Sequence, residues 1–145
     1  MTNKLSTGAI HEAAIRRLHQ WVVDGEPAPS QPRIEIQDGR PAQIVRDELG
    51  NAVGGIRLPE MAAPTAEHRG MSFGTGNAPL FGASRPFPED VLRRMYPTRD
   101  DFERKWESAV DDLVFSGAVL PEDVPAMKAR CRDVELPVDG PATLA

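Results

Sequence analysis

Residues 46–59 read RDELGNAVGGIRLP, and this run constrains the local fold more than any other stretch of the chain. Gly50 adopts positive φ without a steric penalty, and Asn51 is among the few other residues that visit that region readily, so the run begins with turn chemistry. The pair Gly54-Gly55 removes two successive side chains, which predicts a bulge or the close approach of another backbone segment. We therefore expect turns and extended backbone here, and no helix.

The flanks of this run carry strand signals. Residues 33–37 alternate polar and apolar side chains, as a half-buried strand does. Asp38-Gly39 is a strong hairpin-turn pair, and residues 43–46 supply a return strand. Pro59 then disfavours the helical region for the residue before it. Together these signals predict a short β-hairpin region over residues 33–58.

A helix is predicted N-terminal to the hairpin, over residues 8–25. Ser6 or Thr7 can cap its start, and Gly25 is placed to end it. Its apolar stripe has the i, i+3 and i+4 spacing of a helix and consists of Ile10, Ala14, Leu18, Trp21 and Val22. Residues 26–32 are rich in proline, which predicts a stiff extended strap.

Residues 59–87 show no helical or strand period and hold many of the 12 glycines and 14 prolines. They predict a long irregular loop, of the kind that tends to be functional or disordered. Residues 88–132 predict a cluster of three helices, and residues 133–145 a tail that should fray from residue 137 onward. The expected fold class is therefore α+β, with residues 1–145 forming a single domain or subdomain.

The second of these three helices has the clearest signals. Thr98 and Asp101 have the spacing of a capping box, and Gly117 ends the helix. Its apolar stripe consists of Phe102, Trp106, Ala109, Val110, Leu113 and Val114. We expect i, i+4 ion pairs on its solvated face, Asp100 with Arg104 and Asp101 with Lys105. In the third helix, Cys131 falls on the apolar stripe with Val124 and Met127, which predicts a buried small hydrophobic residue.

Residues 70–74 read GMSFG and match the G-x-S-x-G pattern of a nucleophile elbow. An elbow holds its serine between a buried strand and a helix, and the flanks of Ser72 have the signature of neither. In α/β-hydrolases the histidine follows the serine, whereas all three histidines precede Ser72 here. We interpret residues 70–74 as part of the loop.

The histidines offer no metal site. His11 and His19 are eight positions apart, about 12 Å along a helix, so they cannot share one ion. His11 opens the first helix, and it reads either as a surface residue or as the base of a site whose nucleophile a partner supplies. No catalytic, cofactor-binding or metal-binding residue is therefore assigned within the chain, and no cofactor is expected.

Charge and composition exclude several classes of partner. The formal net charge is −5 and no basic run exceeds an Arg-Arg pair, which argues against nucleic acid. No window has the length of a membrane span, the N-terminus has no apolar signal region, and the single cysteine fits a reducing compartment. The expected location is cytoplasmic.

Five blocks along the chain, in this order, resemble the C-terminal region of a family of large bacterial α/β-hydrolases that is mostly uncharacterised. The resemblance covers about residues 8–127. The blocks are residues 18–25 with the strap, residues 46–59, residues 80–87, residues 92–97 and residues 117–123.

The resemblance implies an ester or amide hydrolase, but the nucleophile and the acid of such an enzyme have no counterpart in this chain. Two hypotheses follow. In one, the chain is a C-terminal segment that supports or completes a hydrolase domain, with a complementary hydrolase chain or a second copy as its partner. In the other, it is a stand-alone, non-catalytic interaction domain derived from that family.

Overall fold

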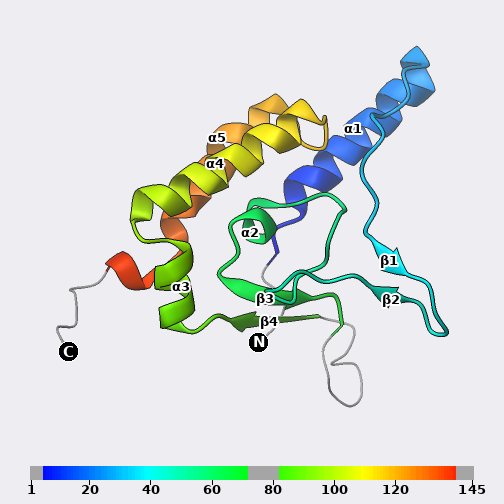
Figure 1. Ribbon diagram of the computed structural model, residues 1–145. Helices are drawn as coiled ribbons and strands as arrows, with labels where there is room; N and C mark the ends of the chain where they lie inside the picture. The colour runs from blue at the N-terminus through cyan, green and yellow to red at the C-terminus, as the bar shows by residue number, and fades with distance from the viewer. Residues whose placement is uncertain (1–4, 72–81, 140–145) are drawn as a thin grey trace.

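The computed structural model describes residues 5–71 and 82–139. These residues form five α-helices, several short 3-10 helices and two two-stranded antiparallel sheets, which confirms the α+β class (Figure 1). None of the described helices has the length and apolar character that crossing a lipid bilayer requires.

Helix α1 (Gly8–Asp24) has the predicted bounds. Gly25 ends it with φ 75°, and the Gly25 N–H donates to the carbonyl of Trp21. Thr7 occupies the N-cap position as expected, but its side chain makes no capping hydrogen bond. Only Ala13 of this helix is buried, and Trp21 is 57% exposed. The apolar stripe of α1 is therefore largely uncovered, because helical spacing identifies an apolar face without showing what covers it.

The strap over residues 26–32 has no regular secondary structure and contacts the residues that follow helix α4 (Arg99–Phe115). The Gln31 side-chain amide donates to the carbonyl of Ser116 at 2.8 Å. Pro29 lies so close to Gly117 that a Cβ at Gly117 would meet its ring. The strap is thus extended, as predicted, and is attached at one point to the helical region.

The hairpin region is also confirmed. Strand β1 (Ile36–Gln37) pairs with β2 (Gln43–Ile44), with Ile36 opposite Ile44. Isolated bridges join Ile34 to Gly54 and Arg46 to Ala52, so the chain after the turn folds back onto the hairpin.

Gly54 shows why the paired glycines are needed. Its φ is 75°, and a Cβ there would overlap with the carbonyl oxygen of Arg33. The predicted close approach of another backbone segment is therefore real.

The irregular loop predicted over residues 59–87 is partly wrong. It contains helix α2 (Pro59–Ala62) and strands β3 (Ala66–Arg69) and β4 (Ala83–Pro86). The two strands pair antiparallel, with His68 opposite Ser84. The inward positions of β3 are Ala66 and His68, which do not give the apolar alternation that identifies a strand from sequence.

The C-terminal helices follow the prediction closely. Helix α3 (Glu89–Met95) precedes α4, and a 3-10 turn leads into α5 (Val124–Ala129) and a further 3-10 helix, η3 (Arg130–Asp133). Figure 1 shows α4 and α5 side by side. The capping box of α4 is present: Thr98 Oγ1 accepts from the Asp101 N–H at 3.2 Å, and the Thr98 N–H donates to Asp101 Oδ2 at 3.1 Å.

The surface of α4 departs from the prediction in its ion pairs. Arg104 contacts Asp101, three positions before it. The Nζ atom of Lys105 lies 5.1 Å from the centroid of the Tyr96 ring. The expected i, i+4 partners are therefore wrong, because capping already holds Asp101 and an aromatic face lies within reach of Lys105.

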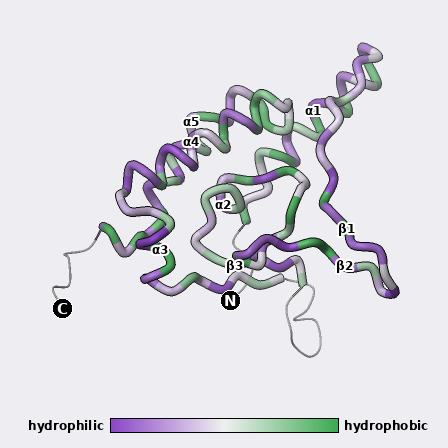
Figure 2. Tube along the Cα trace, in the orientation of Figure 1, coloured by the Kyte–Doolittle hydropathy of each residue, from purple (hydrophilic) through white to green (hydrophobic). Residues whose placement is uncertain are grey.

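The hydrophobic core lies between α2, α3, α4 and α5. Its most buried side chains include Tyr96, Phe102, Trp106, Val110, Val119, Met127 and Cys131. Figure 2 shows polar residues along the outer sides of α3 and α4. Cys131 is buried as expected, and burial raises the pKa of its thiol.

The C-terminal tail also differs from the expectation. Leu136 is buried, with 5% of its surface exposed, and Pro137–Asp139 form a 3-10 turn. The Arg99 guanidinium donates to the carbonyls of Cys131 and Val134 and to the Asp139 carboxylate. This single cation on α4 binds the segment expected to fray, and residues 140–145 lie outside the described part.

Candidate functional site

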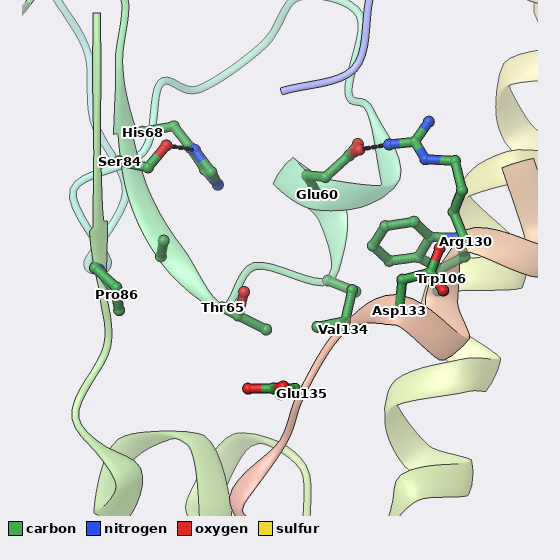
Figure 3. Close-up of a pocket in the computed structure, with 12 residues that line it drawn as sticks. Glu60, Thr65, His68, Ser84, Pro86, Trp106, Arg130, Asp133, Val134 and Glu135 are labelled. Atoms are coloured by element: carbon green, nitrogen blue, oxygen red, sulfur yellow. Dashed lines mark hydrogen bonds and ion pairs between the residues drawn. The ribbon is translucent and has the colours of Figure 1, made fainter. Parts of the chain in front are cut away.

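A pocket of about 590 Å³ lies between the β3–β4 sheet and the C-terminal helices. Figure 3 shows His68 and Ser84 on the strand side, and Trp106, Arg130 and Asp133 on the helical side, with Glu60 between them. The lining consists of Glu60, Ala63, Thr65, Ala66, His68, Ser84, Pro86, Trp106, Arg130, Asp133, Val134 and Glu135.

His68 and Ser84 form the polar wall of the pocket on the strand side. Their residues face each other in the β3–β4 register, and His68 Nδ1 lies 2.9 Å from Ser84 Oγ. His68 is 8% exposed and Ser84 is 6% exposed. Burial lowers the pKa of the His68 imidazole below its usual 6.5, while a hydrogen bond with the Glu60 backbone acts in the opposite direction. His68 is therefore neutral at neutral pH.

The backbone beneath His68 is held by a buried amide. Asn51 Oδ1 accepts from the His68 N–H at 2.7 Å, and Asn51 Nδ2 donates to the Ala66 carbonyl at 3.2 Å. The turn before Asn51 is closed by Asp47 Oδ1, which accepts from the N–H groups of Leu49 and Asn51. The run at residues 46–59 thus positions the strand that carries His68.

The helical wall of the pocket contains an ion pair between distant segments. Glu60 on α2 contacts the guanidinium of Arg130 at the start of η3. Glu60 Oε1 is the atom that makes this contact, whereas Glu60 Oε2 is buried and has no hydrogen-bond partner among the described residues. Trp106 Nε1 donates to the Met127 carbonyl at 2.9 Å, so the indole is fixed in its position beside the pocket.

The residues weighed from the sequence do not gather at this pocket. His11 and His19 are both exposed on α1, outside its lining. Cys131 is buried in the core. Ser72 lies outside the described residues.

The segment before Ser72 differs from the expectation from sequence. Residues 67–69 do form a strand, since they belong to β3. That strand pairs antiparallel with β4 as a hairpin, however, whereas an elbow follows a buried strand of the catalytic sheet and leads into a helix.

Sequence reasoning did not identify the pocket residues. His68 entered the sequence argument only through its position before Ser72, and Glu60, Ser84 and Arg130 carried no signal. Glu60 and Arg130 are 70 positions apart, and no local pattern connects them. Predicting β3 and β4 as paired strands would have placed His68 near Ser84. No other signal in the sequence points to the side of the pocket that these two residues form.

The Ser84–His68 pair has the separation of a nucleophile and its base. The His68 ring has no carboxylate partner in the described structure; its partners are Ser84 Oγ and the Glu60 backbone. The described residues contain no group of three or more His, Cys, Asp or Glu side chains that could hold a metal ion.

Comparison with known proteins gives one match. The family model described as "Alpha/beta hydrolase domain" matches residues 1–129. No curated protein and no solved structure matches the chain. Because the family model covers most of its residues, the chain belongs to the α/β-hydrolase domain family.

Proposed function

We propose that this chain is the C-terminal segment of an α/β-hydrolase domain, that it lacks a nucleophile of its own, and that it completes an ester or amide hydrolase. It does so by docking helix α1 on the remaining part of that domain, a complementary hydrolase chain. The family match and the order of the five sequence blocks support the ancestry. The uncovered apolar face of α1 supports the docking.

The apolar side chains of α1 are mostly in solvent. The exposed fraction is 57% for Leu18 and for Trp21, 64% for Val23, 70% for Ile15 and 77% for Val22. Ile15, Leu18 and Val22 have i, i+3 and i+7 spacing and share one face. Figure 1 shows the C-terminal half of α1 projecting away from both sheets.

Exposing these apolar side chains to water is unfavourable, and burying them in an interface lowers the free energy. Fully burying one of these side chains contributes about 1.5–3 kcal/mol. In domains of the α/β class, helices cover the faces of the central sheet with their apolar stripes. A sheet of that kind is the natural cover for α1, and the two short sheets described here do not provide it.

The catalytic part of the proposal is tested with short-chain p-nitrophenyl esters. We expect no turnover by the purified chain, because an activated serine needs an elbow and an oxyanion hole. Turnover that disappears in Ser72→Ala would restore the elbow at residues 70–74. Turnover that disappears in Ser84→Ala and in His68→Gln would assign catalysis to the pocket. Either result contradicts the absence of a nucleophile.

The docking part is tested by sedimentation velocity and dye binding. We expect the chain to self-associate or to bind an apolar dye, and the double variant Leu18→Glu/Val22→Glu to lose both properties with an unchanged helical spectrum. Ile44→Glu is the matched control, since Ile44 is 46% exposed on β2 and away from this face. A chain that stays monomeric and binds no dye at high concentration would contradict the docking role.

A further inference from the structure

Helix α1 turns small and polar side chains toward the rest of the chain and large apolar ones away from it. Ala13 is the one buried residue of this helix, and Arg17 and Gln20 are partly buried on the same face, four and seven positions later. Arg17 Nη1 donates to Gln20 Oε1 at 3.2 Å. An ion pair of 3.0 Å between Arg16 and Glu122 also joins α1 to the helical region. The inner side of α1 is therefore already occupied.

The outward face of α1 includes two histidines among its apolar side chains. His11 lies four positions before Ile15 and His19 lies four positions after it, so both imidazoles share the face of Ile15. His19 is also three positions before Val22, and His11 is seven positions before Leu18. Both histidines are exposed. The apolar face thus includes two titratable rings, about 12 Å apart along the helix.

The two histidines are the groups on this face whose charge responds to pH near neutrality. Glu12 and Arg16 border the face beside His19, and Arg16 is directed by its ion pair toward Glu122 on another element. Carboxylates and guanidinium groups stay ionised between about pH 5.5 and about pH 7.5. An exposed imidazole changes over that range from mostly charged to mostly neutral.

An imidazole is far easier to bury in its neutral form than in its charged form. A covering surface removes the hydration of two ring nitrogens from the neutral ring, but from the charged ring it removes the much larger hydration of an ion. Covering the face therefore favours the neutral rings, and by linkage protonation weakens the covered state. Docking is strongest above about pH 6.5, where free imidazoles are neutral, and it weakens as the pH falls below that value.

We propose that His11 and His19 make the docking of α1 dependent on pH, so that the complementary hydrolase chain binds near neutral pH and is released under mildly acidic conditions. This inference rests on the proposed docking of α1. The neutral rings pack against the partner beside the apolar side chains of this face. Protonation of either ring places an uncompensated charge in that interface. His68, in the pocket on strand β3, takes no part.

The test compares the full chain at about pH 7.5 and about pH 5.5, with a chelator present so that metal ions cannot bridge histidines. The dissociation constant is measured for a second copy of the chain by sedimentation equilibrium or, in a monomeric chain, for the uncharged dye Nile red. We expect it to rise at least about tenfold at the lower pH, because docking must then release protons from two imidazoles. Circular dichroism at both pH values checks that the helices stay folded.

The chain contains three histidines, and variants divide the pH effect among them. His11→Gln/His19→Gln cannot take up either proton, so its dissociation constants at the two pH values should agree within about twofold. His68→Gln is the matched control, because it removes the buried imidazole of the pocket and leaves the α1 face intact. This control should retain the loss of about tenfold that is expected for the parent.

Four outcomes would overturn the proposal. Equal dissociation constants in the parent at both pH values would show that the rings stay outside the interface, with docking itself intact. Tighter binding at the lower pH would mean that the charged rings meet acidic side chains. A loss that persists in His11→Gln/His19→Gln and disappears in His68→Gln would place the response in the pocket. A chain that binds neither probe at the higher pH would contradict the docking of α1, and this inference with it.

Discussion

The side chain of Asn51 bridges two backbone groups of strand β3, accepting from the His68 N–H at 2.7 Å and donating to the Ala66 carbonyl at 3.2 Å. Asn51 is fully buried, and no residue other than glycine has positive φ in the described structure. Its role is therefore to hold the strand that carries His68, and not to supply left-handed backbone in the turn.

Replacing Asn51 tests this role. Asn51→Ala leaves the His68 N–H and the Ala66 carbonyl without partners, and we expect a loss of about 1–3 kcal/mol in the free energy of unfolding. Asn51→Asp retains the acceptor but places a carboxylate in a fully buried site against the Ala66 carbonyl, so it should lose at least as much as Asn51→Ala. Gln43→Ala removes an exposed amide from β2 and should stay within about 0.5 kcal/mol of the parent. Urea melts give the three values, and an Asn51→Ala midpoint equal to that of Gln43→Ala would contradict the bridge.

Replacing each of the two tryptophans by alanine should change the free energy of unfolding by very different amounts. Trp106 is 2% exposed and hydrogen-bonded, so Trp106→Ala should cost about 3–5 kcal/mol and leave little folded protein. Trp21→Ala removes a side chain that is 57% exposed and should cost no more than about 0.5 kcal/mol in dilute solution. Denaturant melts by circular dichroism compare them. Similar midpoints would mean that α4 is not the core helix.

Acid should destabilise the chain through His68. Burial makes the pKa of His68 in the folded chain lower than in the unfolded chain. The unfolded state then binds more protons as pH falls, so this contribution to stability is fully present above about pH 6.5 and is lost as pH falls through the lower folded-state pKa.

The difference between unfolding midpoints measured above and below about pH 6.5 should therefore be larger in the parent than in His68→Gln, because the variant cannot take up the proton. His19→Gln, which replaces an exposed histidine on α1, is the control substitution. An unchanged pH dependence in His68→Gln would show that the imidazole titrates alike in both states.

Alanine substitutions at Gly25 and Gly54 distinguish the cost of left-handed backbone from the cost of steric overlap. Gly25 and Gly54 both have φ 75°, but a Cβ at Gly25 meets nothing within 4 Å, whereas at Gly54 it overlaps with the Arg33 carbonyl. Gly25→Ala should cost about 1–2 kcal/mol from left-handed backbone alone. Gly54→Ala should cost more than that, because the Ile34–Gly54 bridge must also open. Equal losses in urea melts would contradict the close approach.

Helix α4 could be predicted because its signals are local. The capping box, the apolar stripe and the stop at Gly117 all lie within about twenty residues and agree with one another. The strands β3 and β4 could not, because their inward positions include histidine and serine, and each strand is defined by a partner on the other side of residues 70–82. Backbone hydrogen bonding to a distant segment leaves no period in the sequence.

The sequence by itself determined the α+β class, helices α1, α3 and α4, the hairpin, the close approach at the paired glycines and the family resemblance, because each depends on neighbouring residues or on their order. Only the tertiary structure decided that α1 keeps its apolar face in solvent, that Arg99 binds the C-terminal segment, and that Glu60, His68, Ser84 and Arg130 share one pocket. Those relations join side chains far apart in the chain, and their energies depend on burial and on partners that a local pattern does not contain.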